Sequence, residues 1–389
     1  MENAHPFRAA LIVALVVLAS VAAIFFFRAT DAFYIPSKAD LPGVPGSIIR
    51  SEPIEAFAGA KAWRVLYRST GLSNESIAVS GIVVAPDKAP PAGGYPLVAW
   101  AHPTTGIARR CAPSLDTHVL NTIPDLRLMI AQGYAVAATD YAGLGTEGPH
   151  PYLVGLSAGR TVLDSVRAAR ALTKAGETFA VWGHSQGGHA VLWSGELAPT
   201  YAPDLKLVGV AAAAPAIDLA KLFKDDHSTP AGKIFTALAL SSWSKVYYVG
   251  LDTIIGASDR LFVNWIGQQC LTNRLDLFID SLAVRFMNKQ FLRSDPVSTT
   301  PWDEFIIRNS PGRRPPNAPL FLAQGSDDLL ITPAITQDFA TGVCQNGGIV
   351  QILEMKADHL SIAQVSASSV IAWMADRFAG KPAPTTCAK

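Results

Sequence analysis

Short apolar runs alternate with amphipathic stretches along most of the chain. Runs such as "LVGVAAAA" at 207–214 are apolar at nearly every position, which is typical of strands covered on both faces in a parallel sheet. The stretches between them repeat their apolar residues at helical spacing. We expect strands at 63–67, 77–85, 97–101, 135–139, 180–183, 207–212, 320–323 and 350–354, and helices at roughly 121–132, 159–175, 187–197, 334–343 and 361–378. This alternation predicts a doubly wound α/β fold with a mostly parallel sheet.

Two regions depart from this alternation. Residues 218–316 contain mainly helical patterns with many Phe, Leu and Trp side chains, and about 100 residues are too many for an ordinary loop. We therefore expect an inserted, mainly helical cap at 218–316, between core segments at 54–217 and 317–389. Residues 29–53 mix Pro, Gly and Ser with little periodicity, which predicts a tether or lead-in.

The N-terminal segment, residues 1–28, contains an apolar run at 9–27 that is interrupted only by Ser20. As a helix rising about 1.5 Å per residue, this run would extend about 28 Å, enough to cross the hydrocarbon core of a bilayer. It fits a membrane anchor better than a cleaved signal peptide, whose apolar region usually has about 7–15 residues. Either function would export the rest of the chain, and an anchor would add membrane contact through 9–27.

Charge and cysteine content narrow the function classes. The 389 residues carry 32 Lys and Arg against 31 Asp and Glu, a formal net charge of +1, which gives no electrostatic case for binding nucleic acid. No close C-x-x-C pair occurs, so a zinc or redox site is not expected. In an exported chain, four cysteines predict two disulfides in one of three connectivities, with four buried free thiols as the alternative. The four are Cys111, Cys270, Cys344 and Cys387.

The segment "VWGHSQGGHAVLW" at 181–193 contains a G-x-S-x-G motif centred on Ser185. Strand-like residues end at Gly183 and helix-like residues begin at Gly187, and this strand–turn–helix context is what the motif needs to expose a nucleophilic serine. The start of the following helix would favour the negative charge that develops in acyl transfer. The alternative is a glycine-rich turn that happens to contain a serine.

A serine nucleophile needs a base and an orienting acid, and in folds of this kind they follow the serine in the order acid, then histidine. Asp327 and Asp328 come directly after the expected strand at 320–323, and His359 follows the next strand. Both positions lie beyond the carboxyl ends of strands, where doubly wound sheets build their sites. We predict His359 as the base and favour Asp328 over Asp327 as the acid.

Acyl transfer also needs hydrogen-bond donors for the oxyanion. One donor is expected to be the backbone N–H of Gln186, the residue after the nucleophile. The other should come from the loop "HPTTG" at 102–106, which follows the strand at 97–101. Because Pro103 has no N–H, that donor is Thr104 or Thr105, whose hydroxyl groups could add a further bond. Asp140, at the end of another strand, is interpreted as a structural turn residue.

From about Trp63 to the C-terminus, the chain resembles the α/β-hydrolase superfamily and, within it, the secretory lipase family of the fungal lipase A type. The resemblance rests on "GHSQGGHAVLWSGELAPTYAPDL", "AQGYAVAATDYAGLG", "CAPS", "GSDDLLITP" and "DHLSIA". It implies a catalytic triad of Ser185, Asp328 and His359 and an acyl pocket formed by the inserted cap. It also implies disulfides that pair Cys111 with Cys270 and Cys344 with Cys387.

These observations predict an exported serine carboxylic-ester hydrolase, a lipase or esterase that cleaves apolar acyl esters without a metal or organic cofactor. Its partner would be a small-molecule or lipid ester, with no role for nucleic acid. The alternatives are an acyltransferase or peptidase that uses the same triad, or a non-catalytic binding module with a hydrolase fold. Because a fold alone does not determine the substrate, the structure of the site is needed to distinguish these functions.

Overall fold

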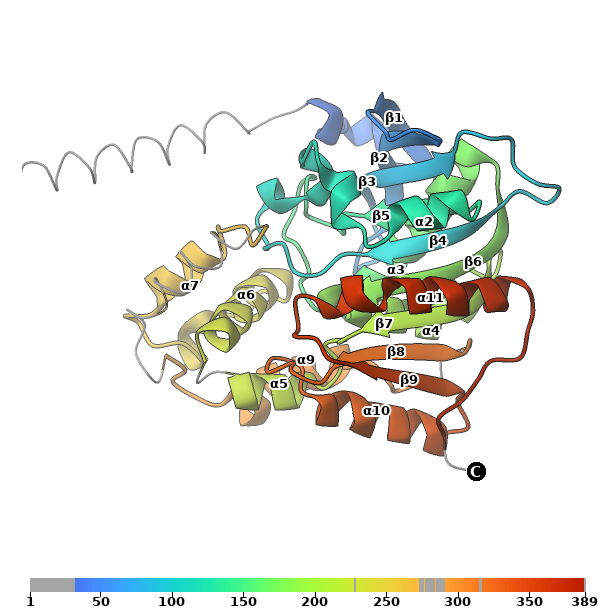
Figure 1. Cartoon of the computed structure of the whole chain (residues 1–389). Coiled ribbons are helices and arrows are strands. Elements are labelled where there is room, and N and C mark those ends of the chain that lie inside the picture. Colours follow the sequence, from blue (N-terminus) through green and yellow to red (C-terminus); the bar gives the residue numbers. More distant parts are fainter. Residues whose placement is uncertain are drawn as a thin grey trace, which may run out of the picture.

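The computed structural model describes residues 32–226, 229–272, 276, 284, 291–314 and 317–387 (Figure 1). The predicted anchor or signal at 1–28, with its apolar run at 9–27, lies outside the described residues. Among the helices that are described, none combines the length and the apolar character that crossing a bilayer requires.

One sheet of nine strands organises the described part of the chain, in the order β1-β2-β3-β5-β4-β6-β7-β8-β9. From β1 to β5 the neighbours are antiparallel, and from β5 through β4 to β9 they are parallel. The predicted doubly wound, mostly parallel α/β sheet is therefore confirmed. The strands are β1 (Ile48–Ile54), β2 (Ala60–Thr70), β3 (Ser76–Pro86), β4 (Tyr95–Ala101), β5 (Ala135–Thr139), β6 (Ala175–His184), β7 (Lys206–Ala213), β8 (Leu320–Gly325) and β9 (Val350–Met355).

Strand β1 corrects the expectation of a lead-in over residues 29–53. Its sequence, "IIRSEPI", pairs antiparallel with β2 at the edge of the sheet, and its side chains are only partly buried. An edge strand with half-exposed side chains needs no continuous apolar run, so its hydrophobic pattern is weak. The earlier residue Tyr34 is also buried, and its hydroxyl bonds to Ser114 Oγ at 2.7 Å, so the folded core begins well before residue 54.

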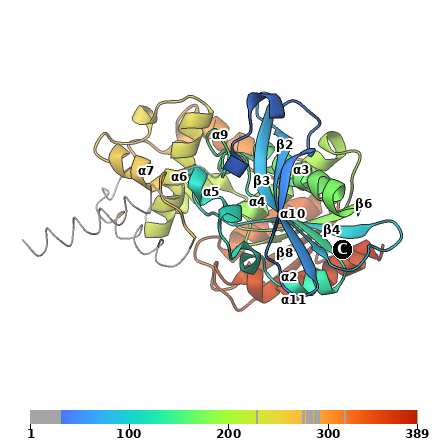
Figure 2. The ribbon, with the colours of Figure 1, turned by 90° about the horizontal axis from the view of Figure 1, so that it is seen from above.

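Helices cover both faces of the sheet, as a parallel sheet requires. Figures 1 and 2 show α2 (Leu126–Ala131) and α11 (Ile362–Phe378) on one face, and α3 (Gly155–Thr173) and α4 (Gln186–Tyr201) on the other. Helix α10 (Pro333–Gln345) packs on β8 and β9. Between the layers, Trp100 and Trp182 occupy paired positions on β4 and β6, with their ring centroids 4.9 Å apart.

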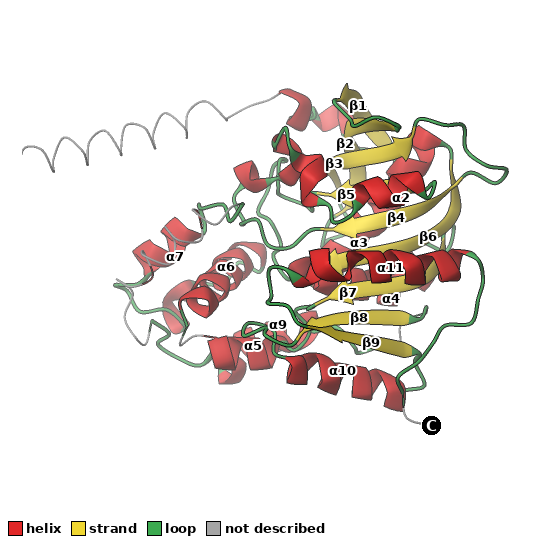
Figure 3. Cartoon of the chain, viewed as in Figure 1, coloured by secondary structure: helices red, strands yellow, loops and turns green. Residues whose placement is uncertain are grey.

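The chain between β7 and β8 leaves the sheet and forms the helices α5 (Leu219–Asp226), α6 (Pro230–Val246), α7 (Arg260–Ile266) and α9 (Trp302–Asn309). Figure 3 shows these helices grouped beyond one end of the sheet. We call residues 218–316 the inserted segment. Its described residues are mainly helical, as their sequence patterns predict.

All four cysteines form disulfide bonds. Cys111 bonds to Cys270 and thereby joins the loop after β4 to the inserted segment. Cys344 bonds to Cys387 and joins α10 to the C-terminal tail. The alternative of four free thiols is therefore wrong, and the two pairs are those that the family resemblance implies.

Candidate active site

Ser185 lies on the turn between β6 and α4, with φ 55° and ψ −114°. This backbone conformation is unfavourable for a residue with a Cβ, so the surrounding structure has to impose it. The Ser185 N–H donates to the carbonyl oxygen of Ala213 at 2.9 Å, and its own carbonyl accepts from the N–H of His189 at 3.0 Å. The turn is thus held between the adjacent strand β7 and the first turn of α4.

The two glycines of the motif are required by close backbone packing. A Cβ on Gly183 would lie 2.2 Å from the carbonyl oxygen of Gly187. A Cβ on Gly187 would lie 1.8 Å from the carbonyl oxygen of Ala101, at the end of β4. Backbone atoms cannot move aside as a flexible side chain can, so the sequence G-x-S-x-G follows from the way in which β4, β6 and α4 meet.

The structure brings together the three residues that the sequence predicts as nucleophile, base and acid. His359 Nε2 lies 2.9 Å from Ser185 Oγ, and His359 Nδ1 lies 2.7 Å from Asp328 Oδ2. All three residues are buried. A serine hydroxyl bonded to an imidazole that is itself bonded to a carboxylate is the arrangement that activates serine for nucleophilic attack.

The two neighbouring aspartates have different environments. Asp328 is buried, and its Oδ1 accepts hydrogen bonds from the N–H groups of Leu330 and Ile331 at 2.9 and 2.8 Å. The side chain of Asp327 is exposed and forms an ion pair with Lys356 at 2.6 Å. Of these two aspartates, only Asp328 contacts His359, which agrees with the preference for Asp328.

His184, which precedes the nucleophile, contacts the other side of His359. Its Nε2 donates to the carbonyl oxygen of His359 at 2.8 Å, and the two rings lie 5.0 Å apart. Burial lowers the pKa of His184 to about 3, with a smaller effect from the neighbouring His359, so its ring is neutral at pH 7. No local signal in the sequence reveals this contact, because the two residues are 175 positions apart.

Gln186 begins α4, and its backbone N–H donates no hydrogen bond within the part of the chain that the structure describes. Its side-chain Nε2 lies 3.0 Å from His150 Nε2, while His150 Nδ1 donates to the carbonyl oxygen of Ala142 at 2.8 Å. That second bond places the acceptor nitrogen of His150 toward Gln186. The side chain of Gln186 is therefore anchored, and its N–H remains available beside Ser185.

The two candidate threonines lie on the loop after β4 in different settings. Thr104 Oγ1 bonds to the hydroxyl of Tyr152 at 2.9 Å. Thr105 Oγ1 is buried and has no hydrogen-bond partner among the described residues. The carbonyl oxygen of Thr105 accepts from the N–H of Leu271, beside the disulfide of Cys270, so the loop is fastened to the inserted segment.

Asp140, at the end of β5, supports the same loop. It is buried, and it accepts hydrogen bonds from Ser80 Oγ at 2.6 Å and from the Ser114 N–H at 2.9 Å. Burial raises the pKa of Asp140 to about 6 although these bonds oppose the effect. Its contacts are those of a structural turn residue, and none of them involves Ser185 or His359.

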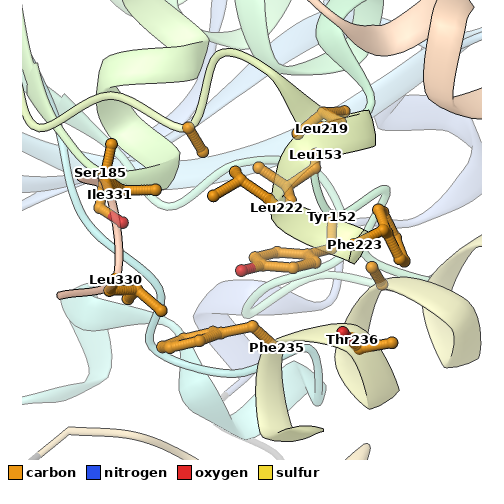
Figure 4. Close-up of a pocket in the computed structure, with 12 residues that line it drawn as sticks. Tyr152, Leu153, Ser185, Leu219, Leu222, Phe223, Phe235, Thr236, Leu330 and Ile331 are labelled. Carbon is orange, nitrogen blue, oxygen red and sulfur yellow. The ribbon is translucent and has the colours of Figure 1, made fainter. Parts of the chain in front are cut away.

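An apolar pocket opens at Ser185 and contains about 450 Å³ of empty volume, part of it open to solvent (Figure 4). Helices α5 and α6 of the inserted segment supply one side of the pocket, and the residues after Asp328 supply another. Its lining residues are Tyr152, Leu153, Ser185, Ala216, Leu219, Leu222, Phe223, Phe235, Thr236, Ala239, Leu330 and Ile331. This lining suits a hydrocarbon chain.

Metal ligands do not gather at this site. Within the described ranges, no group of three or more His, Cys, Asp or Glu side chains is arranged to hold a metal ion.

Comparisons with known proteins agree on one family. Residues 119–386 match the secretory lipase family. The chain is 28% identical to a "Probable inactive lipase" of Mycobacterium tuberculosis, over 90% of this chain and 82% of that protein. It is 27% identical to a secreted triacylglycerol lipase of Malassezia globosa, over 92% of this chain and 82% of that protein. The crystal structure of Candida antarctica lipase A superposes with a TM-score of 0.79 at 20% identity, over 92% of this chain and 87% of that one, and confirms the α/β-hydrolase fold.

The steric argument for the motif can be tested with paired glycine substitutions. We expect Gly187→Ala to destabilise the protein by about 3 kcal/mol or more, because its Cβ would overlap a backbone carbonyl. Gly342→Ala in α10 is the matched control, since no atom lies within 4 Å of the added Cβ. It should be neutral or stabilising by up to about 1 kcal/mol. Chemical denaturation measures both values, and a well-tolerated Gly187→Ala would contradict the close packing.

Stability should fall as the pH is lowered below about 6.5. Burial lowers the pKa values of four buried histidines to between about 3 and 4, so the unfolded state takes up protons before the folded state does. These are His102, His150, His184 and His189. Asp140, Asp164 and Glu196 act in the opposite direction, because burial raises the pKa values of these carboxyl groups, but they are three groups against four histidines. We expect a loss of at least about 1.4 kcal/mol per pH unit between pH 6 and 4.5, measured by denaturant titration. A flat profile would show that these histidines are not held neutral.

Proposed function

The chain belongs to the secretory lipase family, and from that premise we propose that it is an exported serine hydrolase that cleaves apolar carboxylic esters. The observation that carries this proposal is the continuous hydrogen-bonded chain from Ser185 Oγ through His359 to Asp328, at the mouth of an apolar pocket. The hydrogen bonds would activate Ser185 Oγ as the nucleophile, and the pocket suits the acyl part of the substrate.

In the proposed reaction, His359 Nε2 takes the proton of Ser185 Oγ as the oxygen attacks the ester carbonyl. Asp328 holds the imidazole through Nδ1 and stabilises the imidazolium that forms. The tetrahedral intermediate then collapses, the alcohol leaves with the proton from His359, and an acyl-enzyme remains on Ser185. A water molecule, deprotonated by His359, then attacks the acyl group, and His359 returns this proton to Ser185 Oγ as the carboxylic acid is released.

The oxyanion of the tetrahedral intermediate would be stabilised by preorganised donors. The backbone N–H of Gln186 lies at the positive end of α4 and has no other hydrogen bond among the described residues. The loop carrying Thr104 and Thr105 would supply the second donor, as in related folds that use the loop after an early strand.

The lining of the pocket supports an apolar acyl group as the substrate feature that is recognised. Leu219, Leu222 and Phe223 of α5 and Phe235 of α6 all line it (Figure 4). Among the described residues, none that lines this pocket is charged, so a fatty acyl ester fits better than a peptide or a charged acyl group. This favours lipase or esterase activity over peptide hydrolysis.

A non-catalytic role is the second candidate, because one relative is named a probable inactive lipase. Against it, the buried Asp328 and His359 cost free energy to keep in the interior, and their bonds converge on Ser185. Supporting groups such as His184 also converge on the same residues. We therefore favour catalysis, and the first test below separates the two functions.

The secretory family and the two disulfide bonds support an exported location. We propose that the apolar run at 9–27 directs this export and, as an uncleaved anchor, keeps the catalytic part at the membrane. A cleaved signal peptide is the alternative, and the N-terminal sequence of the purified protein would distinguish them.

Ser185→Ala should abolish ester hydrolysis, with kcat/KM falling by about 10⁴-fold or more, because the nucleophile is lost. The assay uses p-nitrophenyl esters of increasing chain length, and the length profile reports the depth of the pocket. Full activity in Ser185→Ala would refute the proposed mechanism. A folded wild-type protein without activity on any ester would favour the binding role.

Asp328→Asn and Asp327→Asn form a matched pair of adjacent substitutions. We expect Asp328→Asn to lower kcat by about 10³–10⁴-fold, since an amide cannot stabilise the imidazolium as a carboxylate does. Asp327→Asn should leave kcat within about twofold, because this residue makes an exposed ion pair of small energetic value. Steady-state kinetics on a short ester measure both, and a reversed order would assign the acid to Asp327.

A further inference from the structure

Tyr152 occupies a position between the acyl pocket and the loop that carries the candidate oxyanion donors. It lies in the connection from β5 to α3, and its side chain is buried and lines the pocket. Figure 4 shows its ring extending across the pocket, with the hydroxyl oxygen on the side of Ser185 and Leu330. No feature of the sequence marks this residue, because tyrosines in loops have no distinctive pattern.

The backbone of Tyr152 is held by α6 of the inserted segment. Its N–H donates to Ser242 Oγ at 2.9 Å, and its carbonyl oxygen accepts from Trp243 Nε1 at 2.8 Å. Ser242 Oγ in turn donates to the carbonyl oxygen of His150 at 2.6 Å. Because both polar groups of the backbone are fixed by one helix, the direction in which the Tyr152 side chain leaves the backbone is fixed as well.

The hydroxyl of Tyr152 lies 2.9 Å from Thr104 Oγ1, across 48 positions of sequence. Each hydroxyl has one proton and two acceptor sites, so one of the two must donate to the other. A phenol, with a pKa near 10 in its unperturbed state, is a better donor than an aliphatic alcohol. With Tyr152 as the donor, the proton of Thr104 is directed away from Tyr152 and can bond to another acceptor.

We propose that Tyr152 is a positioning residue that orients the Thr104 hydroxyl to donate to the oxyanion, while its ring forms a wall of the acyl pocket. This inference rests on the proposed ester hydrolysis at Ser185. It selects Thr104 over Thr105 as the side-chain donor, because only the Thr104 hydroxyl is held by a residue that also lines the pocket. It also means that α6, which holds the backbone of Tyr152, acts on the proposed donor Thr104 through the Tyr152 hydroxyl.

The test is the kinetics of the full chain on p-nitrophenyl butyrate with Tyr152→Phe, Thr104→Val, Thr104→Ser and the double variant Tyr152→Phe/Thr104→Val. Removing an oxyanion donor typically costs about 10²–10³-fold in kcat, so we expect about 100-fold for Thr104→Val and about 10-fold for Tyr152→Phe. KM should change by no more than about twofold, because the bond is made in the transition state. Thr104→Ser, which keeps the hydroxyl, should retain kcat within about threefold of wild type.

Two features of the results identify a shared role. The double variant should be no slower than Thr104→Val by more than about threefold, since residues that act through one bond do not add their effects. Tyr247→Phe is the matched control: it removes a tyrosine hydroxyl that bonds to Asn309 Nδ2 at 2.9 Å, away from the pocket, and should leave kcat unchanged. Tyr152→Phe should also weaken an arylboronic acid inhibitor, a mimic of the tetrahedral state, by the same factor as kcat/KM.

Three results would overturn the inference: wild-type kcat in Tyr152→Phe, a rise in KM alone, or losses that multiply in the double variant. A loss in Thr105→Val with none in Thr104→Val would likewise overturn it and assign the donor to Thr105. The Ser185→Ala protein distinguishes a failure of the inference about Tyr152 from a failure of the proposed function. If wild type hydrolyses the ester and Ser185→Ala does not, the proposed hydrolysis stands whatever Tyr152→Phe shows.

Discussion

The strained backbone of Ser185 is the constraint on which the rest of the site depends. The residue has a positive φ, and around it β4, β6 and α4 approach so closely that neither Gly183 nor Gly187 has room for a Cβ. This packing raises the serine hydroxyl above the end of β6 and leaves the N–H of Gln186 beside it without an intrahelical partner. One strained turn therefore sets the position of both the proposed nucleophile and the proposed oxyanion donor.

The parallel sheet brings the remaining groups to the same place. Because parallel strands end at one edge, the residues after β4, β6, β8 and β9 become neighbours although the sequence separates them widely. Asp328 and His359 follow β8 and β9, and the Thr104 loop follows β4. Around them, His102, His150 and His184 are buried with lowered pKa values, so they are neutral at pH 7 and serve as hydrogen-bonding supports. The only histidine bonded to the serine hydroxyl among the described residues is His359.

The inserted segment lines the apolar pocket at Ser185 and is also joined to the loop after β4. Helices α5 and α6 supply the hydrocarbon wall of the pocket. The same segment is joined to the loop after β4 by the disulfide of Cys111 and Cys270, and by the bond from Leu271 to Thr105. Through Ser242 and Trp243 it holds Tyr152, and through Tyr152 it contacts Thr104. A change of residues in this segment would therefore affect both the acyl group that fits and the geometry of the oxyanion loop.

Features that arise from short-range rules could be predicted from the residues alone. Apolar runs and helical spacing located β2–β9 and the main helices, and the order of Ser185, the aspartates and His359 identified the candidate triad. The tertiary structure was needed to show which aspartate faces the imidazole and how the cysteines pair. It was also needed to reveal the edge strand at 48–54 and the contacts of His184 and Tyr152. The difference lies in the sequence separation over which each effect acts. Periodicity and turn sterics act between neighbouring residues, so a short stretch of sequence reveals them. A hydrogen bond between residues 48 or 175 positions apart depends on how whole helices and strands pack.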